Sequence, residues 1–183
     1  MFGYRKRLFY PVHIECTDQE VAVALVEHYG GKDSELSAAL QYLNHRSNIT
    51  NRYISELLGL IAAEELSHLE VIAAIINKIG LPLNYVNSKE LAWTLRFIDQ
   101  SADLIQMLEA DIESETRSKA LYGRHLGMVS DPGLKKILLF LRKREEVHKS
   151  LLQRALSLVK QGGSQEQFSK LIYDYRMSLQ VLE

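Results

Sequence analysis

Apolar side chains recur at every third or fourth position along most of the chain, a spacing that places them on one face of an α-helix. Only three prolines and ten glycines occur, and they fall between the periodic segments, as expected where helices end. The pattern predicts four long helices, at about residues 34–47, 50–79, 101–127 and 132–160. Because the connection between the second and third is longer than the other two, we expect an all-α protein whose four helices form a bundle with one crossover.

Shorter elements flank and connect these helices. A short helix is expected at about 17–29, with Thr17 as its N-cap, Glu20 completing a capping box and Gly30-Gly31 ending it. The connection at 83–100 is expected to be partly helical around KELAWTLRFI, and the N-terminal stretch RLFYPVHIE is expected to pack on the body. We expect a single domain over residues 1–183, composed of an N-terminal arm and short helix (1–30), the bundle (34–160) and a C-terminal segment (164–183) with a terminal helix at about 164–180.

Composition narrows the class of protein. The 183 residues are 46% hydrophobic and 25% charged, the balance of a soluble globular protein. With 22 basic and 23 acidic side chains the net charge is −1, and the basic stretches YRKR and LRKREE are too short to indicate a nucleic-acid surface. No run approaches the roughly 20 apolar residues of a membrane helix, and Pro11 and His13 interrupt the apolar run near the N-terminus, so we expect neither a membrane anchor nor a signal peptide. The single cysteine, Cys16, excludes an intrachain disulfide and a cysteine-based metal motif, which is compatible with a cytoplasmic compartment.

Two Glu-x-x-His motifs carry the candidate chemistry. Glu65 and His68 lie in the second long helix, and Glu145 and His148 lie in the fourth. Positions three residues apart lie on the same side of a helix, so each pair can reach the same metal ion or neighbouring ones. A single such pair is more often a surface or capped pair than a pair of ligands, so the metal interpretation depends on partners from the other helices.

The first and third helices supply those partners at matching positions. Glu35 and Glu115 each lie 30 residues before the glutamate of the following Glu-x-x-His motif, so the two halves of the chain repeat with an offset of 80 residues. The same offset relates Tyr42 and Tyr122, which lie seven residues beyond these glutamates on the same helix face. They are candidate outer-shell hydrogen-bond donors to the carboxylates, or plain core aromatics. The repeat also selects Glu115 over the nearby acidic residues Glu109, Asp111 and Glu113.

A carboxylate-bridged site for two metal ions is the simplest explanation of these residues. Burying four carboxylates without cations would cost several kcal/mol per unpaired charge. Hard carboxylate ligands suit manganese and iron, and one imidazole per metal leaves positions open for solvent or substrate. One glutamate from each of two helices and a Glu-x-x-His from each of the others is typical of ferritin-like proteins, so we expect a ferritin-like four-helix bundle with a di-metal carboxylate site. Three glutamates near the motifs lie about 100° or more from the ligand face and are expected to be solvated or ion-paired: Glu64, Glu70 and Glu146.

At these residues the sequence resembles the manganese catalase family, including its shorter spore-coat members. The matching stretches, in order over about residues 8–150, are RLFYPVHIE, YGGKDSELSAALQYLNHRS, AAEELSHLEVIA and SDPGLKKILLFLRKREEVH. The resemblance implies that Glu65 bridges two manganese ions whose other ligands are Glu35, His68, Glu115 and His148. It places Glu145 in the outer sphere, hydrogen-bonded to metal-bound solvent, whereas di-iron bundles use the equivalent glutamate as a direct ligand. Longer members continue beyond the fourth helix with a tail that wraps neighbouring subunits of a hexamer, and the short spore-coat members lack this tail, as this sequence does. The resemblance therefore implies a homo-oligomer, though not specifically the hexamer, in the cytoplasm or the spore coat.

The leading hypothesis is that the chain disproportionates hydrogen peroxide to water and dioxygen, with Glu145 moving protons between peroxide and solvent. A manganese pair that alternates between Mn(II) and Mn(III) needs no external electrons, and the chain has no cysteine cluster to deliver them. A di-iron oxidase or peroxidase of the ferritin-like class is the second interpretation, and a structural spore-coat protein with a retained metal site is the third. The expected partners are hydrogen peroxide, further copies of the chain and other spore-coat proteins, with no nucleic acid and no membrane.

Overall fold

The computed structural model describes residues 12–15 and 18–180. Within them, α-helices follow one another along the chain with one 3₁₀ turn, η1, in the longest connection. The α-helices are α1 (Gln19–Gly30), α2 (Glu35–Ser47), α3 (Arg52–Ile79), α4 (Leu104–Leu126), α5 (Pro132–Gln161) and α6 (Gln165–Ser178), and η1 is Leu95–Phe97. The predicted all-α class is confirmed, because the described residues contain no strand beyond an isolated bridge between Val86 and Ala92.

The helix boundaries agree with the periodic pattern to within three residues at each end. The predicted N-cap of α1 is wrong: the side chain of Asp18, one residue later than Thr17, accepts hydrogen bonds from the N–H groups of Glu20 and Val21. Thr17 itself lies outside the described residues. Helix α4 begins three residues later than expected because Asp103 caps it, again by accepting two backbone N–H groups of the first turn.

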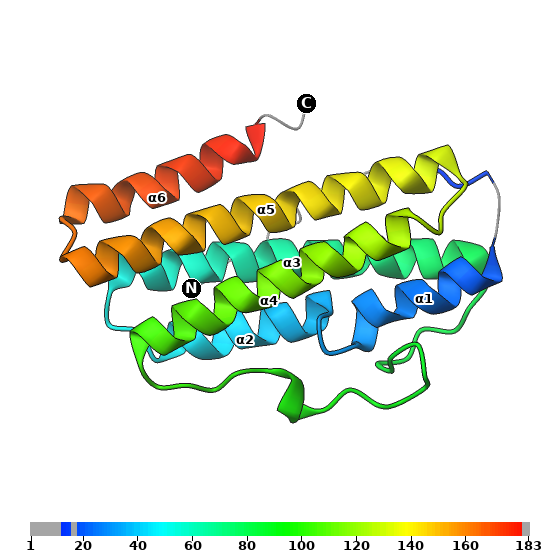
Figure 1. The fold of residues 1–183 in the computed structure, drawn as a ribbon, viewed down its shortest axis with the longest axis horizontal. Helices are drawn as coiled ribbons and strands as arrows, with labels where there is room; N and C mark the ends of the chain where they lie inside the picture. Colours follow the sequence, from blue (N-terminus) through cyan, green and yellow to red (C-terminus); the bar gives the residue numbers. More distant parts are fainter. Residues whose placement is uncertain (1–11, 16–17, 181–183) are drawn as a thin grey trace.

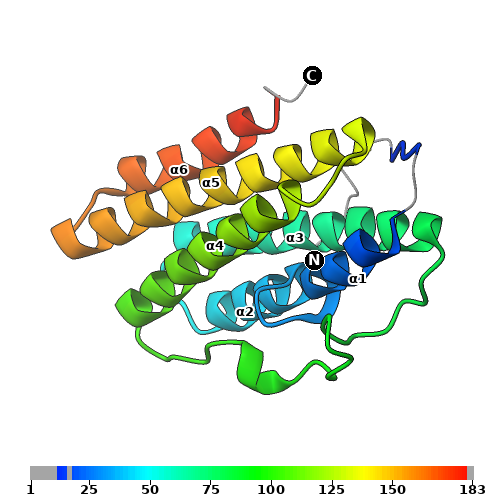
Figure 2. The same ribbon diagram turned by 45° about the vertical axis from the view of Figure 1, so that its right-hand side comes forward.

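Helices α2 to α5 form the four-helix bundle (Figure 1). Two antiparallel hairpins build it, one from α2 and α3 and the other from α4 and α5. Because α3 and α4 run in the same direction, the chain returns along the outside of the bundle in one long crossover (Figures 1 and 2), as the sequence predicted. Helix α1 packs against α3 and the start of α2, and α6 lies on α3 and α5.

The crossover, residues 81–103, is fastened to α2 by hydrogen bonds. Nε1 of Trp93 donates to Oγ of Ser37 at 2.9 Å, and the backbone N–H of Asp99 donates to Oε1 of Gln41 at 2.8 Å. The helical content expected around KELAWTLRFI is limited to the single turn η1. Side chains of α2 form hydrogen bonds with backbone groups of the crossover, which has little regular secondary structure of its own. These bonds keep the segment in place on the bundle.

Buried apolar side chains form two clusters along the bundle. The first joins α1, the C-terminal half of α3 and the first half of α5, and includes the fully buried Ile72, Ile76 and Leu138. The second joins the first half of α3 to the end of α5 and to α6, and includes Leu58 and Leu152. Burying one Leu or Ile side chain contributes about 1.5–3 kcal/mol to the stability of the folded state. The two clusters therefore hold the helices together on either side of a polar centre.

The described part of the N-terminal arm packs on the body, as predicted. Val12 and Ile14 lie against the first apolar cluster. The N–H of Glu15 donates to Oδ2 of Asp131 at 2.8 Å, and Nζ of Lys78 donates to the carbonyl oxygen of Val12. The first part of the stretch RLFYPVHIE lies outside the described residues.

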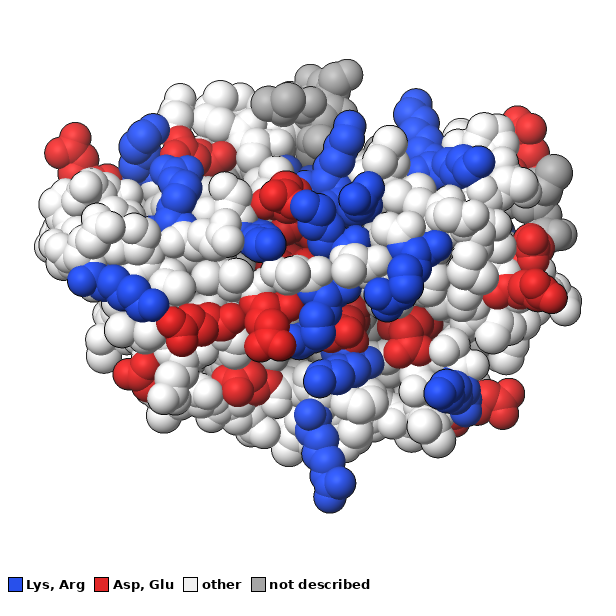
Figure 3. All heavy atoms as spheres, in the orientation of Figure 1, with Lys and Arg blue, Asp and Glu red and all other residues white. Residues whose placement is uncertain are grey.

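No helix in the described part of the chain is both long and apolar enough to cross a membrane. On the face formed by α4 and α5, basic and acidic side chains are intermixed (Figure 3). Ion pairs between Lys119 and Glu146 and between Lys160 and Glu109 join the two helices there. Such partly exposed pairs contribute at most about 1 kcal/mol each, so the apolar clusters dominate the association of the helices.

Candidate metal centre

Six buried acidic and histidine side chains from four helices meet between the two apolar clusters. Helices α2 and α4 each contribute one glutamate, while α3 and α5 each contribute a glutamate and a histidine one turn apart. All six residues are at most 2% exposed: Glu35, Glu65, His68, Glu115, Glu145 and His148. The structure therefore brings together every residue that the duplicated sequence pattern selected.

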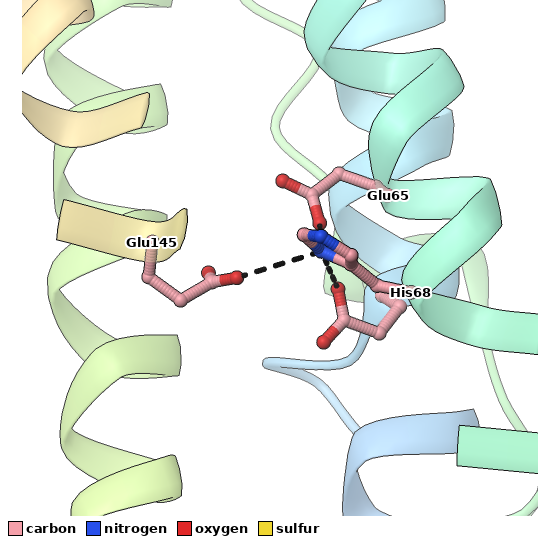
Figure 4. Close-up of side chains that lie close together, drawn as sticks. Glu65, His68 and Glu145 are labelled. Atoms are coloured by element: carbon pink, nitrogen blue, oxygen red, sulfur yellow. Dashed lines mark hydrogen bonds and ion pairs between the residues drawn. The ribbon is translucent and has the colours of Figure 1, made fainter. Parts of the chain in front are cut away.

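The ligand atoms of these residues form two overlapping groups. Within each group the atoms lie within 4.8 Å of one another, and the groups are Glu35, Glu65, His68 and Glu145, and Glu65, Glu115, Glu145 and His148. Glu65 and Glu145 belong to both groups. Figure 4 shows the carboxylate of Glu145 reaching from α5 toward the imidazole of His68 on α3, where it approaches the same nitrogen, Nδ1, that the Glu65 carboxylate contacts. The arrangement offers two adjacent positions for cations with carboxylates shared between them.

The two histidines face the centre through the same ring nitrogen. Nδ1 of His68 lies 2.9 Å from Oε2 of Glu65 and 3.6 Å from Oε2 of Glu35. Nδ1 of His148 lies 2.7 Å from Oε1 of Glu65 and 3.7 Å from Oε1 of Glu115. Each imidazole thus meets one oxygen of the central Glu65 and one glutamate from α2 or α4, so the 80-residue sequence repeat is also a repeat in space.

Several buried polar atoms at the centre form no hydrogen bond within the described part of the chain. Oε1 of Glu65, Oε2 of Glu115, Oε1 of Glu145 and Nδ1 of His148 are buried without a hydrogen-bond partner among the described residues. Leaving a buried polar atom unpaired costs about 1–3 kcal/mol, and more when the group is charged. Carboxylate oxygens and an imidazole nitrogen that lie this close together without hydrogen-bond geometry are the donor set of a metal ion. These residues therefore fit a dinuclear metal site.

The pKa values of the carboxyl groups show how strongly this centre disfavours its own negative charge. Burial, followed by repulsion from Glu145 and Glu65, raises the pKa of Glu35 and of Glu115 well above the usual range. Burial and repulsion from Glu65 raise the pKa of Glu145 to about 7. Burial would also raise the pKa of Glu65, but the charges of His148 and His68 outweigh it and hold that pKa below the usual value. The raised pKa values favour the protonated, uncharged form of these carboxyl groups when no metal is bound. Bound metal cations would offset the same repulsion between the carboxylates.

Two tyrosines orient the outer glutamates. The hydroxyl of Tyr42 on α2 donates to Oε1 of Glu115 on α4, and the hydroxyl of Tyr122 on α4 donates to Oε1 of Glu35 on α2. Burial and the neighbouring carboxylates raise the pKa of both hydroxyls well above 10, so both remain donors. The two hydrogen bonds cross between the hairpins, and each tyrosine is both buried and a hydrogen-bond donor to a carboxylate.

Among the three glutamates expected to be solvated or ion-paired, Glu70 is exposed, and Glu146 is exposed and pairs with Lys119. Glu64 is ion-paired but is also buried, and it contacts the histidines of both motifs. This contact with the histidines was not predicted from the sequence. A usable signal existed, because residue 144, offset by 80 from Glu64, is an arginine of opposite charge.

Comparison with known proteins agrees with this site. The family model for manganese-containing catalase matches residues 1–81 and 79–172. The chain belongs to the manganese catalase family. A probable manganese catalase of Clostridium acetobutylicum is 32% identical over 202 residues, covering 95% of this chain and 90% of the relative. Protein CotJC of Bacillus subtilis is 35% identical over 182 residues, covering 88% of this chain and 96% of that protein.

Solved structures place the same fold in a wider group. KatB, a manganese catalase from Anabaena, superposes with a TM-score of 0.83 at 29% identity, over 87% of this chain and 81% of KatB. The bacterioferritin of Desulfovibrio desulfuricans superposes with a TM-score of 0.68 at 19% identity, over 84% of this chain and 86% of that one. The second likeness concerns the fold alone, and it confirms the predicted ferritin-like four-helix bundle. Membership of the manganese catalase family implies a dinuclear metal site, for which this chain has the buried ligand groups.

Proposed function

We propose that this protein disproportionates hydrogen peroxide to water and dioxygen at a dinuclear manganese site. The observation that carries the proposal is the pair of overlapping, fully buried ligand groups that share Glu65 and Glu145. The proposed ligands are Glu35, Glu65, His68, Glu115 and His148, with Glu65 bridging the two ions. A manganese pair bound there supplies two-electron redox chemistry without electrons from outside.

Residues around this site would transfer protons, position the ligands and limit the access of water. Glu145 is the proposed proton carrier, because its Oε1 has no hydrogen-bond partner among the described residues and its ligand atom lies within both groups. It accepts a proton from the incoming peroxide and returns it to the oxygen that leaves as water. Tyr42 and Tyr122 hold the two outer glutamates in place. The apolar clusters on either side limit the access of water to the site.

Dioxygen evolution tests the proposal directly. Manganese-loaded protein is mixed with hydrogen peroxide without a reductant, and the rate on an oxygen electrode is normalised to bound metal. We expect Glu65→Ala to lose metal and activity together, since both groups contain Glu65. We expect Glu145→Gln to keep its metal and lose about 10²- to 10⁴-fold in rate, the usual contribution of a general acid–base residue.

The matched control for Glu145→Gln is Glu146→Gln. It makes the same change one position along α5, where the side chain is exposed and pairs with Lys119. It should retain both manganese and rate. Full turnover in Glu65→Ala would overturn the proposed ligands, and full turnover in Glu145→Gln would overturn the proposed proton carrier. A requirement for iron and an added reductant would instead identify a di-iron oxidase or peroxidase.

The similarity to CotJC supports a second candidate function, that of a spore-coat protein in which the metal site serves mainly for stability. CotJC matches nearly its whole length to this chain. Assembly into large particles, with two manganese ions bound and negligible dioxygen evolution, would favour this function over catalysis. Sedimentation of the metal-loaded protein, in parallel with the oxygen measurement, distinguishes the two. The homo-oligomer expected from the sequence is tested in the same experiment.

A further inference from the structure

A buried ion pair lies directly behind the two histidines. Nε of Arg144 on α5 donates to Oε1 of Glu64 on α3 at 2.5 Å, and its Nη2 donates to Oε2 at 3.1 Å. Both residues are at most 4% exposed. Each directly precedes the glutamate of its Glu-x-x-His motif, so the 80-residue repeat places a carboxylate in one half where the other half has a guanidinium. The two-pronged contact fixes the orientation of the carboxylate.

The Glu64 carboxylate also meets both imidazoles on the side remote from the centre. Nε2 of His148 is 3.0 Å from its Oε2, at hydrogen-bond distance. Nε2 of His68 is 3.5 Å from its Oε1, an ion-pair contact without hydrogen-bond geometry, so this nitrogen has no hydrogen-bond partner among the described residues. In both rings Nδ1 faces Glu65 and the other ligands, as described above. One carboxylate therefore contacts a histidine from each of the two ligand groups.

Helix α6 completes the environment of this pair. The hydroxyl of Tyr175 donates to Oε2 of Glu64 at 2.9 Å. Arg144 donates through Nη1 to the carbonyl oxygen of Ser178 at 3.1 Å and through Nη2 to its Oγ at 3.2 Å. Figure 1 shows α6 turning back along the C-terminal half of α5, at the left of the view, and its contacts are with α3 and α5. The polar contacts thus run from the C-terminal helix to both histidines without passing through solvent.

We propose that Glu64 is a positioning residue for both halves of the metal centre, held in place by Arg144 and Tyr175. Accepting the Nε2–H of His68 and His148 leaves Nδ1 of each ring unprotonated and directed at a metal ion. A neutral side chain at this position could not serve both rings, because four hydrogen-bond donors and the ion-pair contact of His68 Nε2 converge on two oxygens. The inference rests on the proposed metal site but not on catalytic turnover.

A merely structural ion pair and a positioning residue differ in what they do to metal affinity. Glu64→Gln keeps the shape but replaces one acceptor oxygen by an NH₂ donor that opposes the surrounding donors. We expect Mn²⁺ affinity to fall about 10- to 100-fold at both positions, the usual effect of losing an outer-shell partner of a histidine ligand. The measurement is equilibrium dialysis with metal analysis across a range of free Mn²⁺.

Glu56→Gln is the matched control. Glu56 also lies on α3 and also pairs with α6, through Nη2 of Arg176 at 3.0 Å, but it is partly exposed and, in the described structure, forms no hydrogen bond or ion pair with either histidine. It should bind two Mn²⁺ with wild-type affinity. A Glu64→Gln protein that does the same would overturn the proposal, as would a control that loses as much affinity as Glu64→Gln.

A second measurement uses the unaltered protein and therefore does not depend on whether the variant folds. In protein loaded with Zn²⁺, a diamagnetic probe, ring ¹⁵N and ¹H resonances report which nitrogen of each histidine carries the proton. The proposal requires an exchange-protected Nε2–H on both His68 and His148. A proton on Nδ1 of either ring would overturn it. Metal binding without dioxygen evolution would refute the proposed catalase activity but leave the role of Glu64 intact.

Discussion

Loading the protein with Mn²⁺ should raise its thermal stability in two separable steps. The metal-free centre buries four carboxyl groups, and repulsion among them raises the pKa of Glu35, Glu115 and Glu145. Two cations would replace this repulsion by attraction, and they can bind only where the helices bring the ligands together. The folded state therefore gains the binding free energy of both ions.

The two ligand groups set the size of the effect. A ligand present at 100 times its dissociation constant stabilises the folded state by about 2.7 kcal/mol per site, so two sites give about 5 kcal/mol. For a chain of 150–250 residues, 1 kcal/mol corresponds to a Tm shift of roughly 2–4 °C. We expect the Tm to rise by about 10–20 °C on full loading, measured by scanning calorimetry of chelator-treated protein with and without Mn²⁺.

Variants of single ligands test the assignment of residues to groups. Glu65→Ala damages both groups and should remove nearly all of the shift, whereas Glu115→Ala damages one group and should leave about half of it. Mg²⁺ at the same concentration is the control for a general effect of divalent cations. A full shift in Glu65→Ala, or equal losses in the two variants, would refute the two-site reasoning.

Three further predictions follow from the surroundings of the centre. Leu58→Ala, at a fully buried position of the second apolar cluster, should destabilise the fold by about 2–5 kcal/mol, as measured by urea unfolding. Arg144→Met leaves the buried charge of Glu64 without its partner and should cost about 3–5 kcal/mol in the same assay, so a loss below 1 kcal/mol would contradict the buried pairing. Burial and the neighbouring His125 lower the pKa of His28, so below pH 6.5 the unfolded chain binds more protons than the folded one and stability falls with falling pH. The wild type should lose up to about 1.4 kcal/mol per pH unit more than His28→Phe between pH 6.5 and 5, and equal losses in the two proteins would count against this cause.

The sequence predicted the helices and the ligand residues for the same physical reason, which is that both depend on regular spacing. Apolar periodicity located the helices to within three residues, and Glu-x-x-His at matching positions in two halves located the centre. Caps were harder, because Thr17 and Asp18 are both good N-cap residues and only the geometry of the first turn distinguishes them. The crossover was recognised by its length, but its course depends on contacts such as Trp93 with Ser37, which no local pattern records.

Glu64 shows where periodicity stops being informative. Its angular distance from the ligand face suggested a solvated or ion-paired residue, and on a four-helix bundle alone that face would be open. Helix α6 covers it, with Tyr175 bonded directly to the carboxylate. The contact joins segments 111 residues apart, so it depends on how α6 docks and not on any property of the sequence around Glu64.

The division of the bundle into two hairpins gives the metal centre a mechanical role as well as a chemical one. The most extensive contacts between helices lie within each hairpin, between α2 and α3 and between α4 and α5. The proposed ligands come from both, so the ion bound by Glu65, Glu115 and His148 would cross-link segments that the backbone connects only through the crossover. The ion would join the two hairpins in the folded state only, and its binding free energy would therefore stabilise their association. Loss of metal would then weaken the association between the two hairpins before it weakened the contacts within either hairpin.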